Sequence, residues 1–326
     1  MRTRTSVSTP PLRRGTESVA VTRRVPGLDV PSNANPYYFA PVSRVARITP
    51  NMLRITLSGG DLTRFVSSGD ADERLLVVFP ADGESRPPAP QSIGGTWDYP
   101  VDGHRPEMRS FTVRHWNSET REMDIDFVVH GSGAAVRWAL QARPGQVLGV
   151  TTASGWYRPP DDAAWQLLIA DMTALPAVGR IVEELASGVR VHVIAEVTTA
   201  DDEQCPETAA DVTYTWLHGS GNGVGPSALA DAAREWTCPD GPGYVWFAGE
   251  AGLSREVRRW LRHSLGWSSD RYDVMGYWRA DKEAWTARYE KVRGQIEAAQ
   301  TAALAAGGDF DSLRDAVDAA MEDAGL

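Results

Sequence analysis

The spacing of apolar residues changes near residue 157, and this change constrains the fold more than any other feature of the sequence. Between about residues 38 and 155, short segments such as RSFTVR and DIDFVVHG alternate apolar and polar residues around turn signals, which is typical of paired antiparallel strands. After that, apolar strands such as QLLIADM and VHVIAEV alternate with amphipathic helices such as TALPAVGRIVEELA. This second pattern indicates a parallel, doubly wound sheet. We therefore predict an antiparallel β-barrel followed by an α/β domain.

These patterns divide the chain into four segments. Residues 1–36 are rich in Arg, Ser, Thr and Pro, so a disordered tail is expected there. The barrel would occupy 37–157, with one inserted helix and a long Pro- and Gly-rich surface loop at 81–105. The α/β domain would occupy 158–281 with four parallel strands, and 282–326 would form a C-terminal helical extension that packs on the body.

Charge and cysteine content argue against several classes of function. The chain has 326 residues and a formal net charge of −10, and an acidic surface repels phosphate backbones, so no nucleic-acid partner is expected. Two cysteines without a CxxC pair cannot ligate an iron–sulfur cluster or a structural zinc ion, and no metal site is expected. No apolar run approaches the length of a membrane span, so we expect a cytoplasmic protein without membrane contact.

The segment Arg109-Ser110-Phe111-Thr112 is the first candidate site. On a strand, alternate side chains share a face, so Arg109 and Phe111 lie on one face and Ser110 and Thr112 on the other. An arginine, an aromatic ring and a hydroxyl so close together can hold a phosphate, stack on a flat ring and hydrogen-bond its edge. The alternative is an ordinary strand with an exposed arginine.

A second candidate site runs from a strand at Asp126 through Gly131 and Gly133 into a helix at Ala134. Glycine allows close backbone approach, and the free amides at the start of a helix attract pyrophosphate. The alternative is a simple strand–turn–helix connection.

A third candidate site combines Gly249-Glu250 with Tyr277-Trp278-Arg279, which lie at predicted strand ends. A parallel sheet binds its ligands beyond the carboxyl ends of its strands, although such aromatic residues also serve as core packing. The chain contains neither GxGxxG nor GxxxxGK[ST], so the Rossmann fingerprint and the P-loop are both absent.

In their order and spacing, these segments resemble the siderophore-interacting protein family, within the ferredoxin-reductase-like flavoproteins. RSFTVR resembles the family's Arg-x-Tyr-Thr-x-Arg flavin motif, and DIDFVVHGSGAAVRWALQARPG resembles its Asp-x-x-x-His-Gly stretch. LLIADMTALPAVGRIVEEL resembles its Asp-Glu-Thr-Ala-Leu-Pro-Ala segment, and VWFAGE with GYWR its C-terminal pair. The resemblance covers about residues 38–281. Phe111 replaces the usual Tyr and Met172 the usual Glu.

The resemblance implies a role for each matching position. The FAD-binding residues would be Arg109, Ser110, Phe111, Thr112, Asp126, Val128, His130, Gly131, Gly133, Ala134, Ala135, Thr173, Tyr277 and Trp278. The nicotinamide of NADPH or NADH would lie against Asp171, Thr173, Ala174, Pro176, Gly249 and Glu250. A ferric siderophore would meet Arg279, Lys282 and Lys291.

The activity that the resemblance implies is FAD-dependent reduction of a ferric siderophore by NAD(P)H, which releases ferrous iron in the cytoplasm. No residue is assigned as acid or base, because electron transfer requires neither. Two alternatives stay open: another flavin or ferredoxin reductase of the same fold, and a non-catalytic siderophore-binding protein. A ferredoxin is a further possible electron donor, and the acidic run Asp201, Asp202 and Glu203 disfavours the 2′-phosphate of NADPH.

Overall fold

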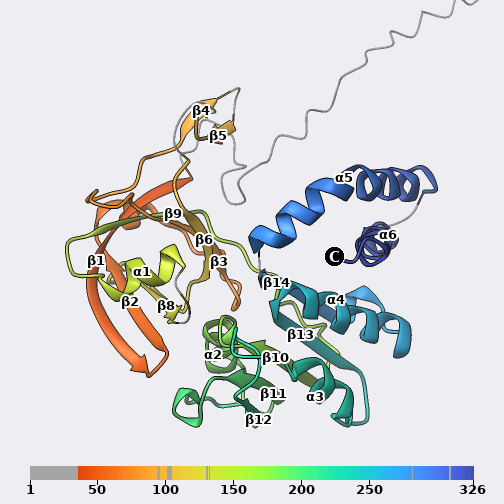
Figure 1. The fold of residues 1–326 in the computed structure, drawn as a ribbon. Helices are drawn as coiled ribbons and strands as arrows, with labels where there is room; N and C mark the ends of the chain where they lie inside the picture. Colours follow the sequence, from red (N-terminus) through yellow and green to blue (C-terminus); the bar gives the residue numbers. More distant parts are fainter. Residues whose placement is uncertain are drawn as a thin grey trace, which may run out of the picture.

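A computed structural model describes residues 36–93, 96–100, 105–129, 131, 133–280, 282–307 and 310–326. It contains a seven-stranded antiparallel sheet, a five-stranded parallel sheet and two C-terminal helices (Figure 1). The predicted fold class is therefore confirmed. The tail expected at 1–36 lies outside the described residues except for its last residue.

The antiparallel sheet curls into a barrel around an apolar core. Its strands follow the order β6-β3-β9-β1-β2-β8-β7, and β6 also contacts β8. The core includes four side chains with no exposed surface: Ile55, Val77, Ile125 and Val150. The elements are β1 (Tyr37–Thr49), β2 (Met52–Ser58), β3 (Arg74–Val78), β6 (Met108–Thr112), β7 (His115–Asn117), β8 (Glu122–Val128), β9 (Val147–Thr151), a 3₁₀ turn at Gly60–Arg64 and the inserted helix α1 (Ala134–Leu140).

Two details of the barrel differ from the sequence prediction. The expected loop at 81–105 contains a small hairpin of β4 (Gln91–Ile93) and β5 (Thr96–Asp98). The strand expected for RSFTVR ends early, because β6 pairs with β3 only as far as Thr112, whereas β7 pairs with β8 from His115. A strand that changes partners must leave one ladder before it joins the next.

The parallel sheet has helices on both faces, as predicted. Along β10, Leu168 and Ala170 face α2, whereas Leu167 and Ile169 face α3 and α4. The strand order is β12-β11-β10-β13-β14. The elements are β10 (Trp165–Asp171), α2 (Leu175–Glu184), β11 (Arg190–Val197), β12 (Asp211–His218), α3 (Leu229–Glu235), β13 (Gly243–Glu250), α4 (Ala251–Arg259) and β14 (Tyr272–Trp278), with short 3₁₀ turns at Ala200–Asp202 and Ser269–Arg271 and a π-turn at Trp260–Ser264.

The prediction of four parallel strands was wrong by one, because it missed β12. This strand lies at the edge of the sheet, and its side chains alternate between exposed and half-buried. DVTYTWLH therefore lacks the continuous apolar run that marks a central parallel strand.

The C-terminal extension forms two helices, as predicted: α5 (Lys282–Ala305) and α6 (Phe310–Asp323). Helix α5 leaves the end of β14 beside the barrel, and α6 returns alongside α4 (Figure 1). Arginines of α4 and the following π-turn hold α6 through the pairs Arg258–Asp318, Arg259–Glu322 and Arg262–Asp315. Within the described part of the chain, no helix has the length and apolar character needed to cross a membrane.

Buried polar groups join the barrel to the α2 face of the parallel sheet. Arg114 donates two hydrogen bonds of 2.6 Å to Glu183 on α2. The fully buried Asp202 accepts hydrogen bonds from Thr49 Oγ1 and from the backbone and side-chain amides of Asn51 in the β1–β2 turn. These contacts fix how the two sheets face each other.

Candidate functional site

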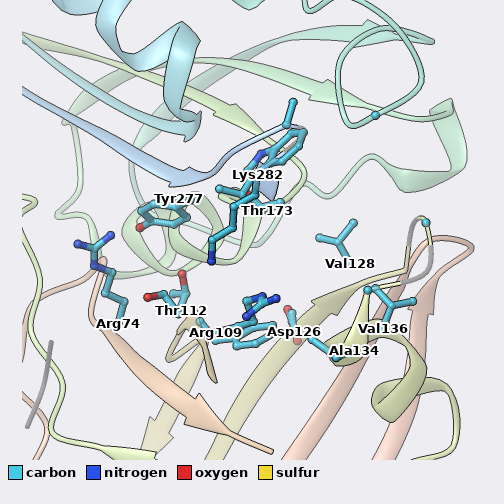
Figure 2. Close-up of a pocket in the computed structure, with 18 of the residues that line it drawn as sticks. Arg74, Arg109, Thr112, Asp126, Val128, Ala134, Val136, Thr173, Tyr277 and Lys282 are labelled. Carbon is cyan, nitrogen blue, oxygen red and sulfur yellow. The ribbon is translucent and has the colours of Figure 1, made fainter. Parts of the chain in front are cut away.

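A pocket of about 880 Å³ lies where the barrel meets the carboxyl ends of β10 and β14 and the start of α5 (Figure 2). Its walls come from segments that are far apart in the sequence. The predicted residues that line it are Arg109, Ser110, Phe111, Thr112, Asp126, Val128, Gly131, Gly133, Ala134, Ala135, Thr173, Tyr277, Trp278 and Lys282. His130, which was predicted to shape the cofactor phosphate region, lies outside the described residues.

At one end of the pocket, the main chain of the turn before α1 is accessible to a ligand. Gly131 has a φ of +64°, and apart from chain neighbours no atom of a described residue lies within 4 Å of the position that a Cβ would take on Gly131 or Gly133. A ligand can therefore approach the main chain closely at this turn.

The middle of the pocket is formed by β6. Phe111 lines the pocket and packs on Phe127, with ring centroids 4.2 Å apart. Arg109 pairs with Glu107 and donates a hydrogen bond to the carbonyl oxygen of Met108. The site thus presents an aromatic ring beside a half-exposed guanidinium group.

Thr112 and Tyr277 bring two buried hydroxyl groups to the wall between the domains. The Tyr277 hydroxyl lies beside that of Thr112 (Figure 2), and neither makes a well-formed hydrogen bond to a described residue. Burial raises the pKa of Tyr277 above its usual value. Because a buried polar group without a partner is costly, these hydroxyls are suited to a polar ligand edge in the pocket.

The carboxylate of Asp126 is paired with an arginine of the barrel. Both of its carboxylate oxygens accept hydrogen bonds from Arg54, at 2.7 and 2.8 Å, and its side chain is fully buried. Burial raises the pKa of Asp126 despite the opposing effect of the guanidinium group. Its carboxylate therefore fixes the pocket wall on β8, and Asp126 is not a free charge facing the cavity.

Asp171 holds two residues of the pocket wall that the parallel sheet forms. Its carboxylate accepts hydrogen bonds from the backbone amide and hydroxyl of Thr173, and from Trp278 Nε1 at 2.6 Å. Burial raises the pKa of Asp171 to about 6. A Cβ on Gly249 would lie 2.9 Å from this carboxylate, so glycine at 249 gives Asp171 room to hold both pocket residues.

The remaining predicted residues do not line the pocket. Ala174 and Pro176 are buried at the start of α2. Glu250 caps α4 by accepting hydrogen bonds from the amides of Gly252 and Leu253. Arg279 lies 4.0 Å over the ring of Trp285, and Lys291 is exposed on α5.

Some of the residues that line the pocket were not predicted. Arg74 begins β3, and Gly223 follows β12, the strand that was itself missed. The unpredicted lining residues are Arg74, Val136, Gly223, Ala280, Glu283 and Ala284. Tertiary contact brings Arg74 and Gly223 to the pocket, whereas the other four lie beside or close to predicted residues in the sequence. Among the described residues, no group of three or more His, Cys, Asp or Glu side chains is arranged to hold a metal ion.

Comparison with known proteins gives the family. Residues 41–156 match the model of the siderophore-interacting FAD-binding domain, and residues 163–281 match that of the siderophore-interacting protein. The ferric vibriobactin reductase ViuB of Vibrio cholerae is 30% identical over 238 residues, covering 72% of this chain and 86% of that protein. The chain belongs to the siderophore-interacting protein family. The resemblance seen in the sequence is thus confirmed.

The chain is also similar to other proteins of known name or structure. The NADPH-dependent ferric-chelate reductase of Escherichia coli K12 is 28% identical to this siderophore-interacting protein, covering 73% of the chain and 91% of that protein. The structure of a siderophore utilization protein from T. fusca is 34% identical, with a TM-score of 0.66 and coverage of 75% and 93%. A ferredoxin NADP+ reductase from Neisseria gonorrhoeae, 10% identical with a TM-score of 0.51 and coverage of 75% and 100%, shows the same fold.

Proposed function

We propose that this protein is an FAD-dependent ferric-siderophore reductase that takes electrons from NADH or NADPH. The observation that carries the proposal is the pocket that joins an aromatic, hydroxyl-bearing barrel wall to the carboxyl edge of a parallel sheet. Such an edge is where dinucleotides bind in doubly wound folds. In this proposal, residues 37–157 hold the flavin and residues 158–281 hold the nicotinamide.

The chemistry of the pocket residues fits FAD. Gly131 and Gly133 leave room for phosphate oxygens, Arg109 supplies a positive charge, and Phe111 supplies an aromatic face. Thr112 and Tyr277 have hydroxyls that a flavin edge would satisfy. When bound, FAD accepts hydride from a nicotinamide and gives electrons singly to ferric iron.

The carboxyl edge of the parallel sheet fits a nicotinamide donor. Asp171 orients Thr173 and Trp278 toward the cavity through the hydrogen bonds described above. Gly249, Glu250, Ala174 and Pro176 shape this edge from behind, and none of them needs to change protonation. The negative charges of Asp201 and Glu203 beyond β11 weigh against a 2′-phosphate, so NADH remains as strong a candidate as NADPH.

Reduction would release the metal, because ferrous iron binds hard-oxygen chelators far less tightly than ferric iron. The protein need only hold the chelate near the flavin edge. Lys282 reaches into the pocket from α5 (Figure 2), whereas Arg279 and Lys291 would act from its surroundings. In this proposal the released iron enters the cytoplasm.

The visible spectrum of the purified protein tests the proposal. We expect a yellow protein that an anaerobic addition of NADH or NADPH bleaches, and that a ferric chelate then reoxidises. A yellow protein reduced only by a ferredoxin would replace the nicotinamide donor. A colourless protein that cannot be reconstituted with FAD would refute the proposal and favour a binding protein.

A further inference from the structure

Arg74 occupies an unusual position at one end of the pocket. Its guanidinium carbon lies 4.1 Å from the centroid of the Trp156 ring and 5.5 Å from that of Tyr277. Three separate elements meet here: Arg74 begins β3, Trp156 follows β9, and Tyr277 lies near the end of β14. The guanidinium N–H groups make no hydrogen bond to a described residue, so they are left for a ligand.

No carboxylate of a described residue forms an ion pair with Arg74. Asp72, two residues earlier, accepts hydrogen bonds from Trp246 Nε1 and from the amides of Trp156 and Tyr157. The other two charges on the barrel wall, Arg109 and Asp126, are paired with Glu107 and Arg54. Arg74 is therefore a partly buried cation that contacts two aromatic rings and forms no ion pair within the described part of the chain.

The position of Arg74 relates it to the reactive part of the proposed site. Arg74 and Thr112 are directly opposite each other in the β3–β6 ladder, so their side chains share one face. In Figure 2, Arg74 lies at the opposite end of the pocket from Ala134 and Val136 of α1. The arginine is thus far from the glycine turn that suits phosphate and close to the hydroxyls that suit the flavin edge.

We propose that Arg74, Trp156 and Tyr277 form the docking corner for the electron acceptor, and that this corner selects anionic catecholate chelates over uncharged hydroxamate chelates. This inference rests on the proposed reductase function. A tris-catecholate complex of a trivalent metal is a polyanion with aromatic ligands, whereas a tris-hydroxamate core is neutral. The N–H edges of Arg74 match two neighbouring catecholate oxygens, and the Trp156 ring, 39% exposed, offers a surface for stacking.

The positive charge of Lys282 would also favour an anionic chelate, although Lys282 is not part of the corner formed by Arg74, Trp156 and Tyr277. It extends into the pocket from the first turn of α5, and Glu283 beside it offsets part of its charge. Arg74 is the cation that contacts both rings of the corner, so its removal is the sharper test.

The experiment measures binding of gallium(III) complexes, which resemble the ferric complexes but are not reduced. The FAD-loaded wild type and the variants Arg74→Gln and Arg74→Lys are titrated with a gallium tris-catecholate and a gallium tris-hydroxamate. Arg158→Gln is the matched control, because Arg158 lies near the same end of the barrel, is 71% exposed and pairs with Asp70. FAD content and the dissociation constant of NADP+ are measured for each variant.

We expect Arg74→Gln to weaken catecholate binding by about tenfold, the loss of one charge-assisted hydrogen bond. Hydroxamate binding, FAD content and NADP+ binding should stay unchanged. Arg74→Lys should restore part of the affinity, and Arg158→Gln should match the wild type.

Three results would overturn the inference. An equal loss for both chelates would mean that Arg74 supports the pocket's shape. Loss of FAD in Arg74→Gln alone would assign Arg74 to the cofactor, and weakened NADP+ binding would assign it to the donor. If the wild type itself retained no FAD, the proposed function would fail instead, and the two failures are therefore distinguishable.

Discussion

At the scale of single residues, the site depends on two neighbouring hydroxyl groups whose hydrogen-bonding capacity the described protein groups do not fill. The hydroxyls of Thr112 and Tyr277 are buried and make no well-formed hydrogen bond to a described residue. Such groups cost free energy in the empty protein and regain it when a ligand supplies the missing bond. They are thus better explained by a bound ligand than by stability.

Thr112→Val tests this explanation. Valine keeps the shape of threonine and removes the unpartnered hydroxyl, so the free energy of unfolding of the FAD-free protein should stay within about 1 kcal/mol of the wild type or rise. The affinity for FAD should fall by about tenfold. Urea denaturation and a flavin fluorescence titration measure the two effects. A clearly destabilised FAD-free variant would show that the hydroxyl is structural.

Asp171 gives a prediction for the pH dependence of stability. Burial raises its pKa to about 6 in the folded state, against about 4 in an unfolded chain. Between these values the folded protein retains a proton that the unfolded chain releases, so this group's contribution to stability falls as pH rises. Asp171→Asn has no such titration.

The free energy of unfolding of the wild type minus that of Asp171→Asn should therefore fall by about 2 kcal/mol between pH 4 and pH 7. Urea denaturation of both proteins across this range measures the difference. A difference that does not change with pH would place the carboxylate in a more polar environment than its buried position indicates.

At the scale of elements, ion pairs join the C-terminal helix α6 to α4. Arg258 is 5% exposed and Asp318 19% exposed in their pair, whereas Arg259 and Glu322 are 49% and 62% exposed in theirs. A buried arginine that loses its partner is costly, but an exposed pair contributes little. The two pairs on one helix face therefore form a matched comparison.

Asp318→Asn should release α6 far more than Glu322→Gln does. We expect the first variant to lose about 2–4 kcal/mol and to expose α6 to hydrogen exchange, and the second to lose less than about 0.5 kcal/mol. Hydrogen exchange of α6 measures both. Equal effects would mean that apolar packing holds the helix.

At the scale of the whole molecule, the pocket exists only because two sheets are held face to face. Both carboxylate oxygens of Asp202 accept hydrogen bonds from the β1–β2 turn of the barrel, and Asp202 lies 153 residues after Thr49 in the sequence. We call these hydrogen bonds the Asp202 tie. These hydrogen bonds hold the pKa of Asp202 below its usual value although burial acts against them. Stability from this tie is therefore present at neutral pH and lost as pH falls below the usual carboxyl range.

Asp202→Ala should loosen the two domains from each other. It leaves the Thr49 and Asn51 donors without partners, so we expect a loss of about 2–4 kcal/mol and a broader or divided thermal transition. Calorimetry at pH 7 measures this, and Asp201→Ala, which removes the exposed neighbouring acid, is the control. A single sharp transition in both variants would show that apolar contacts alone couple the domains.

The sequence by itself determined the two architectures, their order and most of the barrel side of the pocket. Periods of two and of about four residues report which side chains face a core, and motif spacing brought Arg109, Thr112, Gly133, Thr173 and Tyr277 to attention. These signals are local, so they survive without a structure.

The tertiary structure alone decided which polar groups are free. Asp126 and Glu250 look available in the sequence, but Arg54 and the first turn of α4 occupy their carboxylates. Arg74 looks like an ordinary strand residue, but the packing of β3 against Trp156 and Tyr277 places it in the pocket. Pairing and burial depend on contacts between distant segments, and periodicity carries no information about those contacts.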